Sequence, residues 1–485
     1  MARATFLIKL LVLCVLLPGA LGNTNSLNGS PCDNTVNGNV TSSTDVGGNI
    51  VVGCGNIVSN ITSDGATVVT IEITGSDNVA EDDVIRDGDG EFTIVGNRNE
   101  VLNDEADYID LDVANDNQIT NTIVRDYGIY FLDAEANTML DNDIGDYVHV
   151  KHSHANLIAH NIISTEGLNV DYSDNDTITG NIADYINLYK SNNNLIEDNV
   201  MDYYGIEFDN SNNNTVLDNV ADYLQFSSDT SIAVESNHVA HGGIYIADDD
   251  GGTLIKDNQA DYSLKVDYVS AGVVENNDAD YSIFVNAQDR NYNYALSDWE
   301  YRKNSVVVEN NTATTGNIDV GRLGNNSVIA DNTVDELMVV VRRSYSDADF
   351  DNAPVVVMGN VAQDIKMKWN LQNVTVVDNV LGDIFLADVT NFTLSDVGNL
   401  GGNVNLRHKD NYLLNETESA PRACSFCLPA STTDCRPIIH CLPSSRIQSS
   451  PSIRRRRRRR RLRRLRRRRR RRRRLRPTPR FAHRA

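Results

Sequence analysis

The chain has 485 residues and a formal net charge of −23, from 44 Lys+Arg against 67 Asp+Glu. Residues 454–484 hold 22 arginines and no acids, which leaves 22 positive against 67 negative side chains, or −45, on residues 1–453. A surface of that charge excludes nucleic acid and anionic membrane as natural partners. It favours cations (calcium above all), neutral or amino sugars, or basic proteins, and an acidic surface that is merely solvated fits equally well.

The first 22 residues are typical of a signal peptide. Arg3 and Lys9 supply positive charge, residues 10–17 form an apolar run, and residues 20–22 include small side chains for cleavage. The run is too short to span a bilayer. We predict that residues 1–22 are removed and that the product is secreted or extracellular (periplasmic in a bacterium), with no membrane span.

Cys32 and Cys54 are separated by about one repeat of the pattern described below. Stacked coils would bring them one strand spacing (~4.8 Å) apart, which is within disulfide reach in an oxidising compartment. Ten Asn-x-Ser/Thr sequons predict glycosylation in a eukaryotic host, although an asparagine-rich chain also produces sequons by chance. They include Asn28, Asn39, Asn60, Asn175, Asn213 and Asn310.

One asparagine recurs before a short apolar segment through the middle of the chain. Its gaps are 18, 21, 19, 20, 18, 20, 18, 21 and 19 residues, and two longer gaps of 34 and 28 follow. Such a period marks a solenoid, in which identical amides stack and bond to one another and to the turn backbone. The series is Asn103, Asn121, Asn142, Asn161, Asn181, Asn199, Asn219, Asn237, Asn258, Asn277, Asn311, Asn332, Asn360, Asn379 and Asn399, extended backwards by Asn39, Asn60 and Asn78.

Each repeat reads as strands and turns. In residues 194–208, short alternating apolar and polar runs have strand periodicity, and Asn, Asp, Ser and Gly clusters separate them. About twenty residues accommodate three short strands and three turns, and stacked coils share one apolar core. We predict an all-β chain in which residues 23–415 form a right-handed parallel β-helix of about eighteen coils.

An Asp-Tyr pair begins the strand after the asparagine turn in many coils. One interpretation is an Asx-type turn with a ladder of stacked tyrosine rings. The other is a row of weak calcium sites, although one carboxylate in each coil supplies few ligands. The pairs are Asp107-Tyr108, Asp126-Tyr127, Asp146-Tyr147, Asp184-Tyr185, Asp202-Tyr203, Asp222-Tyr223, Asp261-Tyr262 and Asp280-Tyr281.

The repeats at residues 126–131, 213–219 and 310–312 resemble those of the NosD-like family and of the wider carbohydrate-binding and sugar-hydrolase β-helix superfamily. The resemblance spans about residues 39–406 and implies the fold. It leaves the activity open, because the superfamily includes polysaccharide lyases, hydrolases, epimerases, adhesins and a copper-enzyme maturation factor. The polygalacturonase and mannuronan-epimerase signatures are absent from the sequence, which disfavours an enzyme.

Alignment of the coils on the Asp-Tyr pairs predicts one outward stripe, which is either a sugar groove or ordinary surface. It lacks the paired acids that glycoside hydrolysis requires. The stripe is Tyr130, His149, Asn169, Asn187, Glu207, Gln225, Tyr245, Lys265 and Phe284. Close to it, His149, His152 and His154 are weak candidates for a copper or zinc site, with His160 as a turn residue.

The two long gaps predict loops on the flank of the solenoid, at residues 286–303 and 342–353. Binding residues concentrate on such loops. Aromatic rings there can stack on sugars, arginines can bind carboxylated sugars, and Asp298 or Glu300 could act as acid or base. The ligand-binding candidates are Arg290, Tyr292, Tyr294, Asp298, Trp299, Glu300, Arg302, Arg342 and Arg343.

Composition changes sharply after about residue 415, and we predict disorder over residues 416–485. A zinc site is one interpretation of Cys424, Cys427, Cys435, His440 and Cys441, although this signal is weak in a secreted chain. The arginine run either binds polyanions or is a simple DNA repeat translated in an unintended frame.

These observations favour an extracellular β-helix that binds carbohydrate or a cell-surface ligand without catalysis. A polysaccharide lyase, epimerase or hydrolase and a structural or adhesive rod are the alternatives. The sequence establishes no cofactor, calcium is a candidate, and the oligomeric state stays open.

Overall fold

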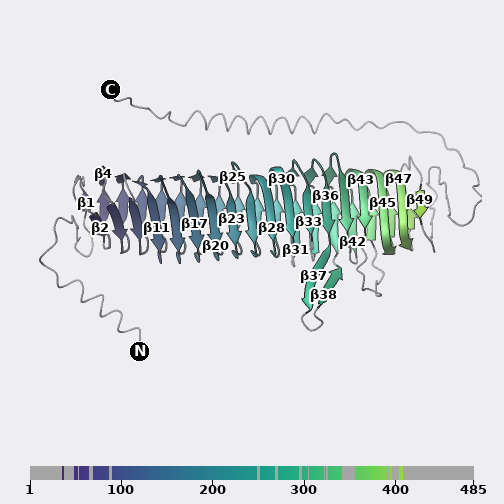
Figure 1. Ribbon diagram of the computed structural model, residues 1–485, viewed down its shortest axis with the longest axis horizontal. Helices are drawn as coiled ribbons and strands as arrows, with labels where there is room; N and C mark the ends of the chain where they lie inside the picture. The colour runs from purple at the N-terminus through teal and green to yellow at the C-terminus, as the bar shows by residue number, and fades with distance from the viewer. Residues whose placement is uncertain are drawn as a thin grey trace, which may run out of the picture. The chain divides into compact units, whose positions relative to one another are not determined.

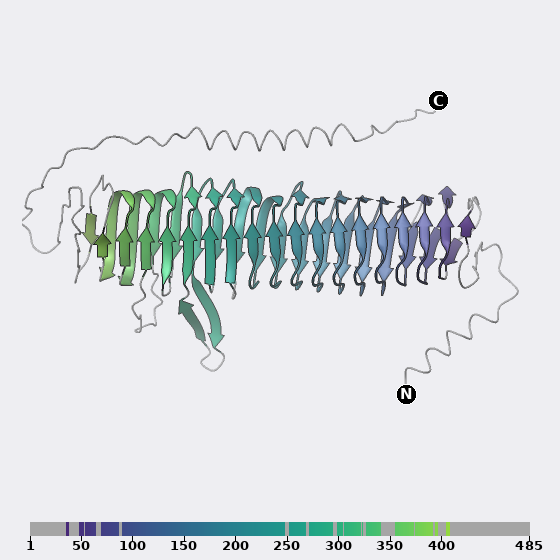
Figure 2. The ribbon, with the colours of Figure 1, turned by 180° about the vertical axis from the view of Figure 1, so that it is seen from behind.

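The computed structural model describes residues 35–37, 48–52, 54–64, 69–86, 90–247, 252–267, 271–293, 298–303, 305–321, 323, 326–340, 355–372, 374–390, 393–395 and 404–407. All of these belong to the first of two compact units, residues 1–438. Within them the secondary structure is β-strand, and Figures 1 and 2 show successive coils stacked side by side.

Each coil places its strands in two sheets. The first sheet has 18 strands and receives one strand from each coil. Its strands are β1 Thr35–Asn37, β3 Ile57–Ser59, β6 Val79–Glu81, β9 Glu100–Leu102, β12 Gln118–Thr120, β15 Thr138–Leu140, β18 Leu157–Ala159, β21 Thr177–Thr179, β24 Leu195–Glu197, β27 Thr215–Leu217, β29 Ala233–Glu235, β31 Gly252–Lys256, β34 Ala271–Glu275, β39 Val306–Glu309, β42 Ser327–Ala330, β44 Val355–Met358, β46 Val374–Val377 and β48 Thr393–Ser395.

The second sheet has 29 strands, because most coils contribute a short strand and a longer one. Its strands are β2 Gly48–Val52, β4 Thr62–Asp64, β5 Val69–Ile73, β7 Val84–Arg86, β8 Glu91–Ile94, β10 Glu105–Ala106, β11 Tyr108–Asp112, β13 Ile123–Val124, β14 Gly128–Leu132, β16 Asp143–Ile144, β17 Tyr147–Lys151, β19 Ile162–Ile163, β20 Gly167–Asp171, β22 Ile182–Ala183, β23 Ile186–Tyr189, β25 Val200–Met201, β26 Ile206–Asp209, β28 Val220–Ser227, β30 His238–Ala247, β32 Gln259–Ala260, β33 Leu264–Asp267, β35 Asp278–Ala279, β36 Ile283–Asn286, β40 Thr312–Ala313, β41 Asn317–Gly321, β43 Thr333–Val340, β45 Val361–Gln372, β47 Val380–Thr390 and β49 Val404–Arg407.

Strands of successive coils pair in parallel, so equivalent residues lie directly above one another. Ile186 pairs with Ile206, and Ile206 with Leu224, and all three side chains point into the core. Phe208 and Phe226 stack there with ring centroids 4.6 Å apart. No coil could bury these side chains alone, and stacking gives all of them one continuous core. The predicted all-β parallel solenoid is confirmed.

Stacked asparagines form the predicted ladder at the turn after the first sheet. The backbone N–H of Asn161 donates to Oδ1 of Asn181 (2.9 Å), while its Nδ2 donates to the same oxygen (3.0 Å) and to the carbonyl oxygen of Met139 (3.1 Å). Each buried amide therefore ties its own coil to both neighbours. The asparagines of this ladder are Asn142, Asn161, Asn181, Asn199, Asn219, Asn237, Asn258, Asn277, Asn311, Asn332, Asn360 and Asn379.

The predicted series is wrong by one position in the earlier coils. Asn103 and Asn121 are exposed and have φ angles of 58° and 52°, and Asp104 and Thr122 occupy the buried ladder position after them. Asn60 likewise precedes the buried Ile61. Each turn has a residue in the left-handed conformation followed by a buried residue, and asparagine suits both positions. The recurrence of asparagine alone therefore does not show which of the two positions it occupies in a given coil. Asn39 and Asn399 lie outside the described residues.

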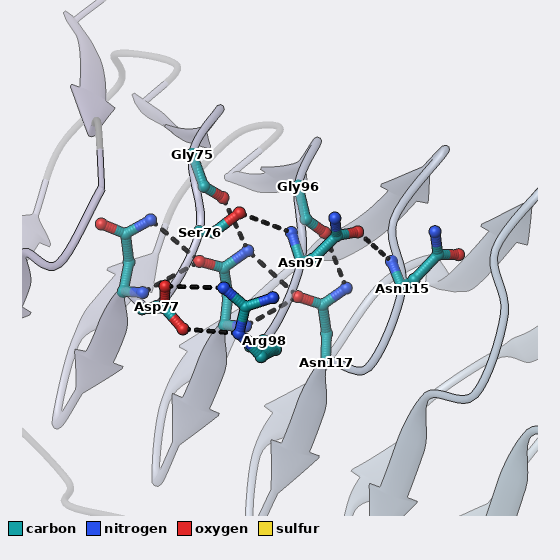
Figure 3. A network of polar contacts seen from close by, with 10 residues as sticks. Gly75, Ser76, Asp77, Gly96, Asn97, Arg98, Asn115 and Asn117 are labelled. Carbon is teal, nitrogen blue, oxygen red and sulfur yellow. Dashed lines mark hydrogen bonds and ion pairs between the residues drawn. The ribbon is translucent and has the colours of Figure 1, made fainter.

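A second asparagine ladder precedes the first sheet and was not predicted. Nδ2 of Asn99 donates to the carbonyl oxygen of Gly75 at 3.0 Å. Nδ2 of Asn117 donates to that of Gly96, also at 3.0 Å, as Figure 3 shows. Asn78, predicted in the first series, belongs here. Its members are Asn56, Asn78, Asn99, Asn117, Asn137, Asn156, Asp176, Asn194 and Asn214.

Left-handed residues occupy the turn position before each ladder. The sequon asparagines Asn60, Asn175, Asn213 and Asn310 are exposed and have φ angles of 54–63°. Their glycosylation stays a prediction, although the exposure leaves room for a glycan. Cys54 is disulfide-bonded. Its predicted partner, Cys32, lies outside the described residues.

In the part of the chain that the structure describes, we find no helix with the length and apolar character needed to cross a membrane.

Candidate functional site

The predicted outward stripe runs unbroken along the second sheet. Strand register pairs its nine members in sequence, from Tyr130 opposite His149 to Lys265 opposite Phe284. It continues to Asp110 before Tyr130 and to Asp319 after Phe284. These side chains are half-buried or exposed, whereas the residues that alternate with them are buried. The coil alignment from sequence is therefore confirmed.

Contacts between neighbouring coils hold the stripe side chains in place. The rings of Tyr130 and His149 meet edge to face with centroids 5.1 Å apart, and Nε2 of His149 lies 3.0 Å from Oδ2 of Asp171. Further along, the ammonium of Lys265 lies 4.5 Å from the ring centroid of Tyr245. Rings, amides and charges thus share one ordered outward face.

Asp110 is the most perturbed acid of this face. Burial, followed by repulsion from Asp112 and Glu91, raises the pKa of its carboxyl to about 6. Its Oδ1 is buried and, within the described part of the chain, has no hydrogen-bond partner. The surroundings hold acids and tyrosines, so this end of the stripe disfavours anionic ligands.

The Asp-Tyr pairs do not form the continuous ring ladder that we predicted. Tyr147 lies opposite Gly128 and Gly167, and Tyr223 lies opposite Gly243. Tyr127 and Tyr203 instead point to solvent, with exposed fractions of 47% and 65%. The ring row is interrupted because some coils place glycine where others place tyrosine.

The three histidine candidates have separate surroundings. His149 bonds to Asp171, while Nδ1 of His152 lies 3.7 Å from Asp133 at a left-handed turn. His154 accepts a hydrogen bond at Nδ1 from the backbone N–H of Asp174 (3.0 Å), as a part of the turn. His160 occupies a left-handed turn position, as a turn residue does.

The described residues contain no group of three or more His, Cys, Asp or Glu side chains placed to hold a metal ion. Among the described residues, therefore, neither the three histidines nor the aspartates of the Asp-Tyr pairs, which were considered for calcium, form such a group.

The first predicted flank loop is an antiparallel hairpin of β37 (Gln288–Asn293) and β38 (Asp298–Lys303), which projects away from the stacked coils (Figure 1). Its register places Tyr292 opposite Trp299 and Arg290 opposite Tyr301. In the same register, Asn291 pairs with Glu300, Asn293 with Asp298, and Asp289 with Arg302. Tyr294, Arg342 and Arg343 lie outside the described residues, as do residues 342–353.

The hairpin begins directly after a stripe strand. β36 ends at Asn286 and carries Phe284, and β37 starts at Gln288. The hairpin, with its aromatic residues, is therefore connected directly to a strand that carries a stripe residue.

A comparison with known families matches residues 91–227 to the model described as periplasmic copper-binding protein (NosD). Residues 91–227 carry NosD-type repeats. They coincide with the most regular coils and with the stripe from Asp110 to Gln225. The periplasmic description agrees with the predicted address outside the cytoplasm. A comparison with curated proteins gives no match.

The described side chains of residues 91–227 do not form a set of donors for the copper that the family description names. His149, His152 and His154 each face a different group, and no metal-binding cluster occurs among the described residues. The residues described here therefore do not fit a copper centre.

Proposed function

We propose that this protein is an extracytoplasmic β-helix that binds a polysaccharide along the outward stripe of its second sheet, without catalysis. The carrying observation is the unbroken register of that stripe from Tyr130 to Phe284. A ligand with a linear repeat can make the same kind of contact at each coil.

The composition of the stripe supports a sugar ligand. Sugars present apolar ring faces and hydroxyl groups, which aromatic rings and amides can contact together. Tyr130, Tyr245 and Phe284 supply rings, while Asn169 and Asn187 supply amides. One coil rises ~4.8 Å, close to the length of one sugar unit in an extended chain.

The hairpin supports the same proposal at one edge. Its register groups Tyr292, Trp299, Tyr301 and Arg290 at neighbouring positions. Aromatic side chains and arginine are enriched at binding sites. The hairpin would therefore add a second contact beside Phe284 for a ligand that lies along the stripe.

Replacement of Trp299 or Tyr245 by alanine tests this arrangement. We expect each change to weaken binding about tenfold, since loss of one ring contact is worth roughly 1–2 kcal/mol. Affinity gel electrophoresis of the whole chain, with the polysaccharide that retards the parent protein, measures the effect. Tyr127→Ala is the matched control, because Tyr127 is 47% exposed and lies off the stripe. Unchanged retardation of both test variants would contradict the proposed site.

A further inference from the structure

Tyrosine and glycine alternate along the row beside the stripe. Strand register places Gly128 opposite Tyr147, and Tyr147 opposite Gly167. The pairing of Ile186 with Leu168 and with Ile206 puts Tyr185 between two glycines in the same way. The row therefore reads Tyr108, Gly128, Tyr147, Gly167, Tyr185, Gly205, Tyr223 and Gly243 over eight consecutive coils.

At Gly167 and Gly205, both the backbone and the ring of the tyrosine in the next coil lie close to the glycine. A Cβ at Gly205 would lie 2.8 Å from Cδ2 of Tyr223 and 2.0 Å from its carbonyl oxygen. A Cβ at Gly167 would lie 3.1 Å from Cδ1 of Tyr185. Each of these rings thus leans over the glycine of the preceding coil.

The leaning rings reach the stripe in that preceding coil. Nδ2 of Asn169 donates to the Tyr185 hydroxyl (3.0 Å), and the Tyr223 hydroxyl donates to the carboxylate of Glu207. Asn169 and Glu207 are both stripe residues, two coils apart. The spacing of these two tyrosine-anchored groups matches the two-coil period of the tyrosine–glycine row, while the stripe itself repeats every coil.

We propose that the stripe between Asp110 and Gln225 recognises a polysaccharide with a two-sugar repeat, in the form of an extended β-linked chain of neutral or amino sugars. This inference rests on the proposed function. Two coils rise ~9.6 Å, which is close to the repeat of two sugar rings in an extended twofold chain. Two sugars one unit apart from a common neighbour would meet the tyrosine-anchored groups at Asn169 and Glu207, and the sugar between them would lie at Asn187, in the coil that carries Tyr185.

The charges select within this class of glycan. Along the segment, acids outnumber bases in the stripe and in the row on its other side from the tyrosines and glycines. The acids there are Asp110, Asp112, Asp171, Glu207 and Asp209, against the one base Lys151. A chain of uronic acids would meet repulsion there, whereas neutral or amino sugars would not.

The test is calorimetry of the whole protein with β-1,4-linked gluco-oligosaccharides and glucosamine oligosaccharides of two to eight units, and with oligogalacturonates, which form a threefold chain. We expect affinity to rise in steps at even lengths, by about tenfold for each added pair. A smooth rise with every sugar, or a preference for oligogalacturonate, would overturn the two-sugar repeat and leave polysaccharide binding standing. Absence of binding to every glycan would overturn both.

A double variant, Tyr185→Ala with Tyr223→Ala, tests the anchoring groups separately. We expect it to weaken binding of the six-unit ligand at least tenfold and to remove the even-length steps. The control is Tyr203→Ala, since Tyr203 is 65% exposed and lies outside the row. A thermal melt establishes that both variants are folded. Even-length steps that persist in the folded double variant would overturn the assignment.

Discussion

Replacement of Asn199 by alanine is expected to lower the free energy of unfolding by about 3–5 kcal/mol. Oδ1 of Asn199 accepts from the backbone N–H of Asn181 (2.9 Å), and its Nδ2 donates to the carbonyl oxygen of Ile178 (2.8 Å) and to Oδ1 of Asn219 (3.1 Å). All these groups are buried. Alanine would remove the partner of the Asn181 N–H and of the Ile178 carbonyl in the preceding coil, and each unpaired buried group costs about 1–3 kcal/mol.

Urea unfolding followed by circular dichroism measures this effect as a shift in midpoint at constant slope. Asn187→Ala is the matched control, because Asn187 lies on the outward stripe, in strand β23. We expect this variant to change the free energy of unfolding by no more than about 0.5 kcal/mol. Equal, small shifts for the two variants would show that the ladder amides add little to stability.

Stability is expected to fall as the pH rises from about 4 to about 8, and the buried ladder aspartates are the cause. Burial raises the pKa of Asp83 and of Asp176 to about 7 and that of Asp104 to about 8. In each, Oδ1 accepts a backbone N–H as an asparagine would. Oδ2 is buried at the place where an asparagine has its Nδ2 donor, and it lacks a hydrogen-bond partner in the described residues.

A protonated carboxyl can donate from Oδ2 and so imitate the asparagine amide, whereas a carboxylate cannot. The folded state therefore binds these protons more tightly than the unfolded state, whose aspartates titrate near 3.9. The stabilisation is complete below that value and is lost as the pH rises through the folded pKa values of about 7 to 8. Neighbouring acids such as Asp82 and Asp174 raise the pKa further.

Asp176→Asn separates this effect from the general repulsion of an acidic surface. We expect it to stabilise the protein by about 1–3 kcal/mol at pH 8.5 and to change little at pH 4, because asparagine supplies the donor at every pH. Thermal melts between pH 4 and pH 9 measure it. Asp198→Asn is the control at an exposed, left-handed turn position. A destabilised Asp176→Asn protein at pH 8.5 would refute the assignment of the proton.

The sequence predicts most of the fold because one coil determines the next. Apolar alternation gives the strands, and the Asp-Tyr pairs align them well enough to place all nine stripe residues in register. The asparagine period establishes the solenoid. The period assigns the wrong residue to the buried ladder position at Asn103 and Asn121, because asparagine is favoured at both the left-handed and the buried position of one turn.

The site is harder to predict, because contacts between coils decide it. The alternation of Gly167 and Gly205 with Tyr185 is visible in the sequence only after register is known. The clustered histidines attracted a metal hypothesis, yet His154 serves the turn backbone. The second asparagine ladder, from Asn56 to Asn214, has a period similar to that of the first and could have been found by following two series.

The most direct test of the proposed function is affinity electrophoresis of the whole protein through gels that contain neutral, amino and acidic polysaccharides, with product analysis of the same mixtures. The proposal predicts retardation by a neutral or amino polysaccharide and no new reducing or unsaturated ends. Free migration in every gel would contradict polysaccharide binding, and release of new ends would contradict a non-catalytic role.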